Sequence, residues 1–259
     1  MTPDITLDHR DGVLTLTLDR PDKKNALTDP MYEALANAVE RAETDSDVRV
    51  LVIRAAGDTF CAGNDLQTFR DYGADAEPTP IEERAVGRFL HALAVSTTPI
   101  VAAVQGKAVG VGMTLLLHCD HLLMAEGSQL MAPFVDLALV PEAGSTTLLA
   151  ERVGHARAFA MLGLGEPLPA EAAVAAGVAN AVVPAADLHA AAQEVAERLA
   201  AKPAVSLRAT KRLMRDSERL LRQIDAELVV FDERLRSPEA QAMFAAFAAK
   251  GESGSRPAS

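Results

Sequence analysis

The chain has 259 residues, enough for one large domain with a sizeable buried core. Apolar residues make up 49% of it and charged residues 24%, which is an ordinary composition for a globular protein. The formal net charge of −11 argues against a non-specific nucleic-acid binder, although a few local cations can still hold an anionic ligand.

Neither a secretion signal nor a membrane span is predicted. The N-terminal MTPDITLDHRDG lacks a basic start followed by an apolar run, and no uncharged apolar stretch reaches roughly 18 residues. Cys61 and Cys119 are too few for a disulfide framework and lack the spacing of metal ligands. These features favour a cytoplasmic protein without a metal site.

The first part of the chain predicts strands that alternate with helices. Residues 13–18 (VLTLTL) alternate leucine with threonine, as in a strand with one buried face. Asp29 and Pro30 are predicted as the N-cap and first position of a helix. Residues 48–53 (VRVLVI) predict the next strand. The apolar stripe of the predicted helix consists of Met31, Leu35, Val39 and Ala42.

The middle of the chain continues this recurrence. Residues 71–80 (DYGADAEPTP) are rich in turn formers and predict a surface loop. Residues 99–104 (PIVAAV) and 120–125 are short apolar runs, typical of buried strands. Residues 109–117 predict a turn that enters a helix. Together the elements predict an α/β core of stacked ββα units.

Alanine-rich helical patterns dominate from about residue 152 onward, and Ser237 and Pro238 begin a last helix. The change in composition fits a domain boundary, or a helical layer packed on the core or on a neighbouring subunit. We divide the chain into a core at residues 1–195, a C-terminal helical oligomerisation region at 196–250 and a disordered tail at 251–259.

Three segments are candidates for chemistry. Residues 60–66 (FCAGNDL) and 103–114 (AVQGKAVGVGMT) are small-residue turns, the second leading into a helix. Such turns let backbone N–H groups approach a ligand oxygen, and a helix N-terminus favours negative charge there. Residues 133–145 (PFVDLALVPEAGS) place the carboxylate of Glu142 before another small-residue turn. Each of the three segments is also compatible with an ordinary turn. Glu142 is also compatible with the role of the acidic residue at the N-terminus of a helix at 145–152.

Other chemistry is not indicated. The sequence contains no P-loop, HExxH or GxSxG motif, and no GxGxxG after the first strand. The six histidines form no i, i+4 pair and no HxH cluster, and His91 and His118 are more typical of surface or core residues. Cys61 fits a small buried apolar position better than a nucleophile.

Four segments in register resemble the crotonase (enoyl-CoA hydratase/isomerase) family across about residues 11–249. The resemblance implies an α/β fold, a crotonase-like spiral of stacked ββα units with a C-terminal helical layer, that assembles as a homotrimer or dimer of trimers. The matching segments are residues 18–27 (LDRPDKKNAL), similar to NRPxxxNAL; 60–66, similar to FxAGxDL; 99–114, similar to KPxIAAVxGxAxGGG; and 163–184, similar to LTGxxxxAxxAxxxGLVxxVV.

The resemblance also implies the site. The backbone N–H groups of Asn64 and Val111 would form an oxyanion hole for the thioester carbonyl of an acyl-CoA, each worth about 3–4 kcal/mol. Lys24 and residues 62–66 would line the adenine and phosphate side of CoA, with Arg20 and Lys23 near the phosphates. CoA is part of the substrate, so no cofactor is expected. The implied substrate-binding residues are Lys24, Ala62, Gly63, Asp65, Leu66, Gly110, Thr114, Phe134 and Leu139.

The positions of the acidic residues distinguish the reactions within the family. Hydratases carry two glutamates that activate water, and the corresponding positions here are Thr114 and Phe134, so hydration is not expected. Glu142 matches the single catalytic acid of Δ3,Δ2-enoyl-CoA isomerases. One carboxylate in apolar surroundings can take a proton from C2 and return it at C4. The sequence therefore predicts an isomerase of lipid and fatty acid metabolism that converts 3-enoyl-CoA to 2-enoyl-CoA.

Two alternatives stay open. The same carboxylate also suits another reaction on a CoA thioester, such as a ring-expanding isomerase of the 1,2-epoxyphenylacetyl-CoA type, a hydratase-like reaction or one of secondary metabolism. The second alternative is a catalytically silent acyl-CoA-binding protein, which would catalyse no proton exchange at C2. The pocket for the acyl tail is expected from residues 71–95 and the C-terminal helices.

Overall fold

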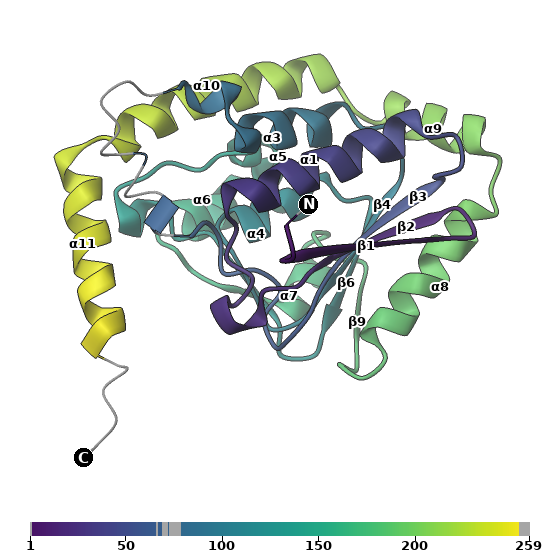
Figure 1. Ribbon diagram of the computed structural model, residues 1–259, viewed down its shortest axis with the longest axis horizontal. Coiled ribbons are helices and arrows are strands. Elements are labelled where there is room, and N and C mark those ends of the chain that lie inside the picture. Colours follow the sequence, from purple (N-terminus) through teal and green to yellow (C-terminus); the bar gives the residue numbers. More distant parts are fainter. Residues whose placement is uncertain (1, 66, 69–71, 73–78, 254–259) are drawn as a thin grey trace.

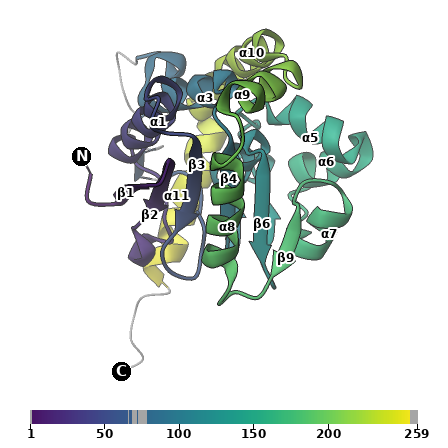
Figure 2. The same ribbon diagram turned by 90° about the vertical axis from the view of Figure 1, so that its right-hand side faces the viewer.

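A six-stranded sheet lies at the centre of the computed structural model, which describes residues 2–65, 67–68, 72 and 79–253. The strand order is β1-β2-β3-β4-β6-β9, and all neighbours are parallel except β1 and β2 (Figure 2). The strands are β1 (Ile5–Arg10), β2 (Val13–Leu18), β3 (Val50–Ala55), β4 (Ile100–Val104), β6 (His121–Ala125) and β9 (Ala181–Val183).

Helices cover both faces of this sheet. On one face α1 (Asp29–Thr44) packs against α3 (Ala85–Val95), and α3 packs against α10 (Ser217–Leu235) (Figure 1). On the other face α8 (Leu188–Ala200) packs along the strands (Figure 2). The predicted α/β core with a helical layer is therefore confirmed.

The apolar runs of the central strands follow from burial on both faces, as expected for parallel strands. In β3, Leu51 and Ile53 belong to the main core, whereas Val50 and Val52 belong to a second cluster beneath α8. Alternate residues point to opposite faces because side chains along a strand have a period of two. The face of α8 in this cluster is formed by Leu188, Ala192, Ala196 and Ala200.

A smaller three-stranded sheet carries the glycine-containing turns. Its strands are β5 (Lys107–Val109), β7 (Gln129–Met131) and β8 (Leu168–Pro169). The chain leaves β5 through Gly110 and enters α4 (Val111–Thr114) and the 3₁₀ helix η3 (Leu115–His118). The turn into a helix predicted at residues 109–117 is confirmed.

The remaining elements follow the order of the chain. Besides η1 (Pro21–Lys23), η2 (Ile81–Glu83) and η4 (Val135–Leu137), they are α5 (Ser145–Val153), α6 (His155–Gly163), α7 (Ala170–Ala175), α9 (Ala204–Leu213) and α11 (Pro238–Ser253). The predicted start of the last helix at Pro238 is confirmed, and residue 195, chosen as a domain boundary, lies inside α8. Residues 254–259 of the predicted tail lie outside the described residues.

Three local predictions need correction or completion. The N-cap of α1 is Thr28, not Asp29, because Thr28 has extended backbone angles and its carbonyl accepts the Tyr32 N–H at 2.9 Å. The short strands of the smaller sheet were not predicted, since runs of two or three residues carry little periodicity. Strand β1 was not predicted either, because its sequence ITLDHR is mostly polar and mostly exposed. Of the predicted loop at residues 71–80, only Tyr72, Thr79 and Pro80 are described.

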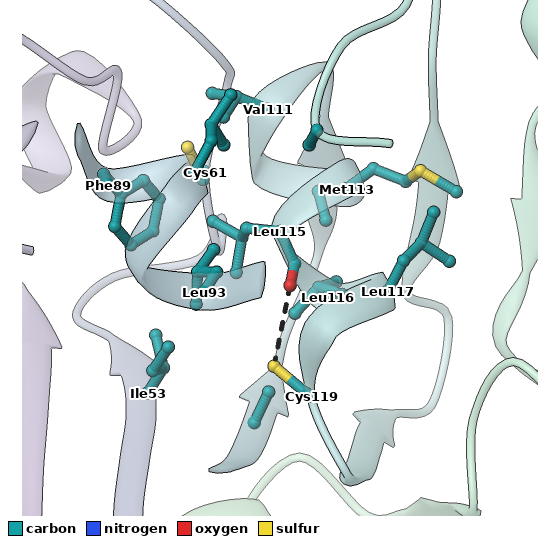
Figure 3. Close-up of a cluster of buried hydrophobic side chains, with 14 of the residues drawn as sticks. Ile53, Cys61, Phe89, Leu93, Val111, Met113, Leu115, Leu116, Leu117 and Cys119 are labelled. Carbon is teal, nitrogen blue, oxygen red and sulfur yellow. Dashed lines mark hydrogen bonds between the residues drawn. The ribbon is translucent and has the colours of Figure 1, made fainter. Parts of the chain in front are cut away.

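The core behind α4 is built from apolar side chains of several elements (Figure 3). Cys61 lies next to Val111, Phe89 of α3 lies on the Cys61 side, and Leu93 of α3 lies near Leu115. The thiol of Cys119 lies 3.8 Å from the Leu115 carbonyl oxygen. Both cysteines are buried and unoxidised, and burial raises the pKa of each thiol to about 12. The interpretation of Cys61 as a small buried apolar residue is confirmed.

The described residues contain neither a candidate membrane span nor a candidate metal cluster. None of their helices is both long and apolar enough to cross a bilayer. No cluster of three or more histidine, cysteine, aspartate or glutamate side chains among them is arranged to hold a metal ion.

Candidate active site

Two backbone segments that are distant in sequence lie side by side at the ends of β5 and α1. The Val109 N–H donates to the Cys61 carbonyl at 2.9 Å, and Cys61 N–H donates to the Lys107 carbonyl at 3.1 Å. The Leu27 N–H donates to the Gly63 carbonyl at 2.8 Å. The residue 61–64 turn is thereby fixed next to the N-terminus of α4.

These bonds leave two N–H groups available. Within the described part of the chain, neither the Asn64 nor the Val111 N–H donates to a protein acceptor. Val111 is the first residue of α4, where an N–H has no partner inside the helix. Gly110 before it has φ 55°, a backbone conformation that glycine adopts without strain. The geometry therefore provides two free donors on neighbouring turns, as an oxyanion hole requires.

A cavity of about 220 Å³ lies at these donors and is lined largely by apolar atoms. The Phe134 ring, which is only 5% exposed, packs against Gly110. Seven predicted site residues meet around this outer cavity: Ala62, Gly63, Asn64, Gly110, Val111, Phe134 and Leu139.

Glu142 lies behind the outer cavity and is almost completely buried, with 2% of its surface exposed. Its Oε1 lies 2.5 Å from the Thr114 hydroxyl oxygen, and its Oε2 has no hydrogen-bond partner among the described residues. Burial raises the pKa of Glu142 to about 8; the Thr114 hydrogen bond opposes this rise and the charge of Glu227 adds to it. A carboxyl group that titrates near neutral pH can accept a proton and return it.

Glu142 faces a second, inner cavity of about 10 Å³, which it shares with Tyr32 and Asn64. Asn64 also lines the outer cavity, so this residue lies between the cavity at the free N–H groups and the cavity at the carboxyl group. The described apolar walls of the inner cavity come from the regions predicted for the acyl tail: Ile81 and Val86 on one side, and Leu228 and Phe231 of α10 on the other.

Tyr32 and Glu227 were not predicted as site residues. The Tyr32 hydroxyl donates to the Asn64 side-chain oxygen at 2.6 Å and so restrains one of the two turns. Burial, together with the negative charge of Glu142, raises the pKa of Tyr32 and keeps this hydroxyl protonated. Glu227 carries a signal in the sequence, because it occupies the apolar stripe of α10 formed by Leu220, Ile224, Leu228, Phe231 and Leu235.

Replacing Tyr32 by phenylalanine is expected to lower the free energy of unfolding by about 1 kcal/mol, since one hydrogen bond is lost while the ring is kept. Urea denaturation followed by circular dichroism measures this difference. Because the Asn64 side chain is half-buried, water replaces part of the lost bond. A loss above about 3 kcal/mol would contradict this account and would indicate that the hydroxyl fixes more than the Asn64 side chain.

Several predicted residues lie outside both cavities. The Thr114 hydroxyl donates a hydrogen bond to Glu142, and Thr114 does not line the outer cavity. Lys24 lies beside Ala62, whose N–H donates to the Lys24 carbonyl at 2.9 Å, but its ammonium group pairs with Asp58 at 2.9 Å. Asp65 accepts from Arg20 at 2.8 Å, so these two side chains engage each other. Leu66 lies outside the described residues.

His118 is a core residue, as the sequence indicated. It is 1% exposed, its Nε2 lies 2.8 Å from the Ala143 carbonyl oxygen and its Nδ1 lies 2.7 Å from an Arg215 nitrogen. A carbonyl only accepts and a guanidinium only donates, so the imidazole is neutral with its proton on Nε2. Burial and the Arg215 charge lower the pKa of His118, in agreement with this assignment.

Comparisons with known proteins place the chain in a family. The model of the enoyl-CoA hydratase/isomerase family matches residues 8–254. The 1,2-epoxyphenylacetyl-CoA isomerase of Escherichia coli K12 is 36% identical over 212 residues, 80% of each chain. The probable enoyl-CoA hydratase EchA14 of Mycobacterium tuberculosis is 38% identical over 205 residues, 78% of each chain.

Structural similarity agrees with the sequence match. The structure of OdaA from Pseudomonas aeruginosa is similar with a TM-score of 0.89 and 41% identity, and the match covers 95% of this chain and 99% of that one. The spiral of stacked units predicted from the sequence is confirmed by this likeness. The chain thus belongs to the enoyl-CoA hydratase/isomerase family, the crotonases.

Proposed function

We propose that the chain moves a double bond in an acyl-CoA thioester from C3 to C2, with Glu142 as the group that carries the proton. The observation that supports this proposal above all is the Glu142 carboxyl group, buried at 2% exposure and with a pKa near 8, beside two free backbone donors. The thioester oxygen would accept from the Asn64 and Val111 N–H groups, which places C2 near the carboxylate.

The reaction would proceed in two proton transfers. Glu142 breaks the C2–H bond and takes the proton, while the electron pair passes into a dienolate whose oxygen is held by the two N–H groups. The protonated Glu142 then gives the proton to C4, and a bond between C2 and C3 becomes the double bond. Atoms and charge balance without a cofactor, and CoA takes part only as a portion of the substrate.

The surroundings of Glu142 do not favour addition of water. A hydratase needs two groups that orient and deprotonate a water molecule, and the corresponding positions hold the Thr114 hydroxyl and the Phe134 ring. Phe134 packs against Gly110 next to the free donors and excludes water from that position. Water addition is therefore expected to be slow relative to isomerisation.

The test is a substrate panel in deuterated water. With 3-hexenoyl-CoA we expect conversion to 2-hexenoyl-CoA, seen by absorbance of the conjugated thioester, with deuterium at C2 and C4 seen by NMR. With 2-hexenoyl-CoA we expect little hydration. Absence of both isomerisation and C2 exchange would contradict the proposal and favour a silent acyl-CoA-binding protein.

A second candidate is ring expansion of a 1,2-epoxyphenylacetyl-CoA-like substrate. It is favoured by the 36% identity to the Escherichia coli enzyme of that name. The same panel separates the two, because 1,2-epoxyphenylacetyl-CoA would then react faster than 3-hexenoyl-CoA.

We also propose that the chain forms a homotrimer or a dimer of trimers. In support, α9 and the residue after it expose large apolar side chains, which are unusual on a monomer surface when they gather together. They are Val205 at 85%, Leu213 at 86% and Met214 at 84% exposure.

A further inference from the structure

A single peptide group follows Glu142 in the chain and is held from both sides. It joins Ala143 to Gly144. Its carbonyl oxygen accepts from His118 Nε2 at 2.8 Å, and its N–H donates to Glu227 Oε2 at 2.6 Å. An imidazole from η3 and a carboxylate from α10 thus fix the plane of one peptide between them.

The backbone around this peptide needs such support. Ala143 has φ 65° and Gly144 has φ 69°, so two successive residues are left-handed, and for alanine this conformation costs free energy. Gly144 also packs tightly against α10: a Cβ at this position would lie 2.4 Å from Leu220 Cδ1. The direction in which Glu142 leaves the main chain depends on this turn.

Glu227 makes more contacts than a helix cap requires. Besides the Gly144 N–H, it accepts from the Thr146 N–H at 3.1 Å, from the Thr146 hydroxyl and from Gln223 at 3.4 Å. Glu227 is therefore the acidic residue at the N-terminus of α5, a role that the sequence alone also allowed for Glu142. This frees Glu142 to face the inner cavity.

We propose that Glu227 is a positioning residue for the reaction: through the Ala143–Gly144 peptide, and against His118 on the other side, it holds the Glu142 carboxyl group toward the inner cavity. This inference rests on the proposed role of Glu142. Glu227 is not itself among the described residues that line either cavity, so it acts through the turn and through its charge.

The two carboxyl groups are expected to differ in protonation. Burial raises the pKa of Glu227, but four hydrogen bonds oppose this rise and favour its ionised form. Glu142 has one such bond, and its Oε2 has no partner among the described residues. The nearby negative charge of Glu227 raises the pKa of Glu142 further. The other titratable groups at the inner cavity are Asp29, Tyr32 and Tyr72, and the two tyrosine hydroxyls have raised pKa values.

The test is an infrared titration of the full chain without substrate. The carbonyl band of the protonated Glu142 is the one that Glu142→Gln removes, and its midpoint in the unmodified chain is expected at a pH near 8. In Glu227→Gln the midpoint should move to lower pH by on the order of one unit, because a negative charge is lost. The control Glu233→Gln makes the same change on the exposed side of α10 and should leave the midpoint in place.

The kinetics of 3-hexenoyl-CoA isomerisation separate the effect of the position of the Glu227 carboxylate from the effect of its negative charge. In Glu227→Asp the charge remains but the carboxylate retracts, so the midpoint should stay near that of the unmodified chain while kcat falls about 10-fold with KM nearly unchanged. This variant also serves if Glu227→Gln does not fold. An unshifted midpoint in Glu227→Gln, or unchanged kcat in Glu227→Asp, would overturn the inference. A shifted midpoint in a chain that isomerises nothing would instead contradict only the proposed function.

Discussion

The Glu142→Gln variant is expected to isomerise 3-hexenoyl-CoA about 10²–10⁴-fold more slowly than the unmodified chain, which is the usual contribution of a positioned general base. Glutamine has nearly the same shape but cannot accept the C2 proton. The Thr114 hydroxyl can still bond to the amide oxygen, so the site geometry is kept. Binding of saturated hexanoyl-CoA, measured by calorimetry, should be unchanged within about twofold.

The control for this variant is Glu126→Gln, the same chemical change at an exposed position in the turn after β6. It should isomerise at the rate of the unmodified chain. In the unmodified chain, kcat/KM should rise with pH to a plateau above about 8, because only the ionised Glu142 accepts a proton. A Glu142→Gln variant that keeps this rate and pH profile would assign the proton transfer to another group.

Stability provides a readout of Glu142 that does not depend on any substrate. Its pKa is raised from 4.5 in the unfolded chain to about 8 in the folded one, so the folded protein binds a proton that the unfolded chain releases. The stabilisation is therefore present at low pH and is lost as the pH rises through about 8. Relative to the unmodified chain, Glu142→Gln should gain roughly 2–5 kcal/mol of unfolding free energy between about pH 5 and pH 9. Comparing the two pH values cancels differences in packing.

The fold was largely predictable because its main strands are buried on both faces. Apolar runs such as residues 99–104 leave few alternatives to a central parallel strand, and β4 occupies Ile100–Val104. The strands β5, β7 and β8 span two or three residues each and are set by pairing with one another, which local patterns do not reveal. Strand β1 escaped prediction for another reason, because its sequence ITLDHR is mostly polar and mostly exposed.

The site was predictable where chemistry and local sequence coincide, and not where it depends on distant contacts. Small residues in two turns indicated backbone N–H groups that could hold a ligand oxygen, and the resemblance to the crotonase family assigned them to Asn64 and Val111, whose N–H groups have no described protein acceptor. The bond between Glu227 and Gly144 joins residues 83 positions apart, and no local pattern pairs them. A glutamate within the apolar stripe of a helix does indicate a buried partner, although it does not say which one.

The Val111→Pro variant tests the oxyanion hole by deleting one N–H group and little else. It is expected to lower kcat/KM for 3-hexenoyl-CoA by about 10²–10³-fold, the usual effect of losing one such donor. Proline is tolerated at the first position of a helix, where this N–H has no intrahelical partner. Gly110, with φ 55° and ψ −123°, is close to the mirror image of the extended conformation that precedes proline, and glycine, which has no side chain, adopts it without strain.

The matched control is Val111→Ala, which keeps the N–H and shortens the side chain. The Val111 side chain is fully buried and lies beside Cys61 in the core (Figure 3). Val111→Ala should therefore lose stability by about 1–3 kcal/mol but retain most of its activity, whereas Val111→Pro should lose activity. Equal kcat/KM in the two folded variants would show that the thioester oxygen does not depend on this donor. A loss confined to Val111→Pro would place the developing negative charge at the N-terminus of α4, where the helix dipole also favours it.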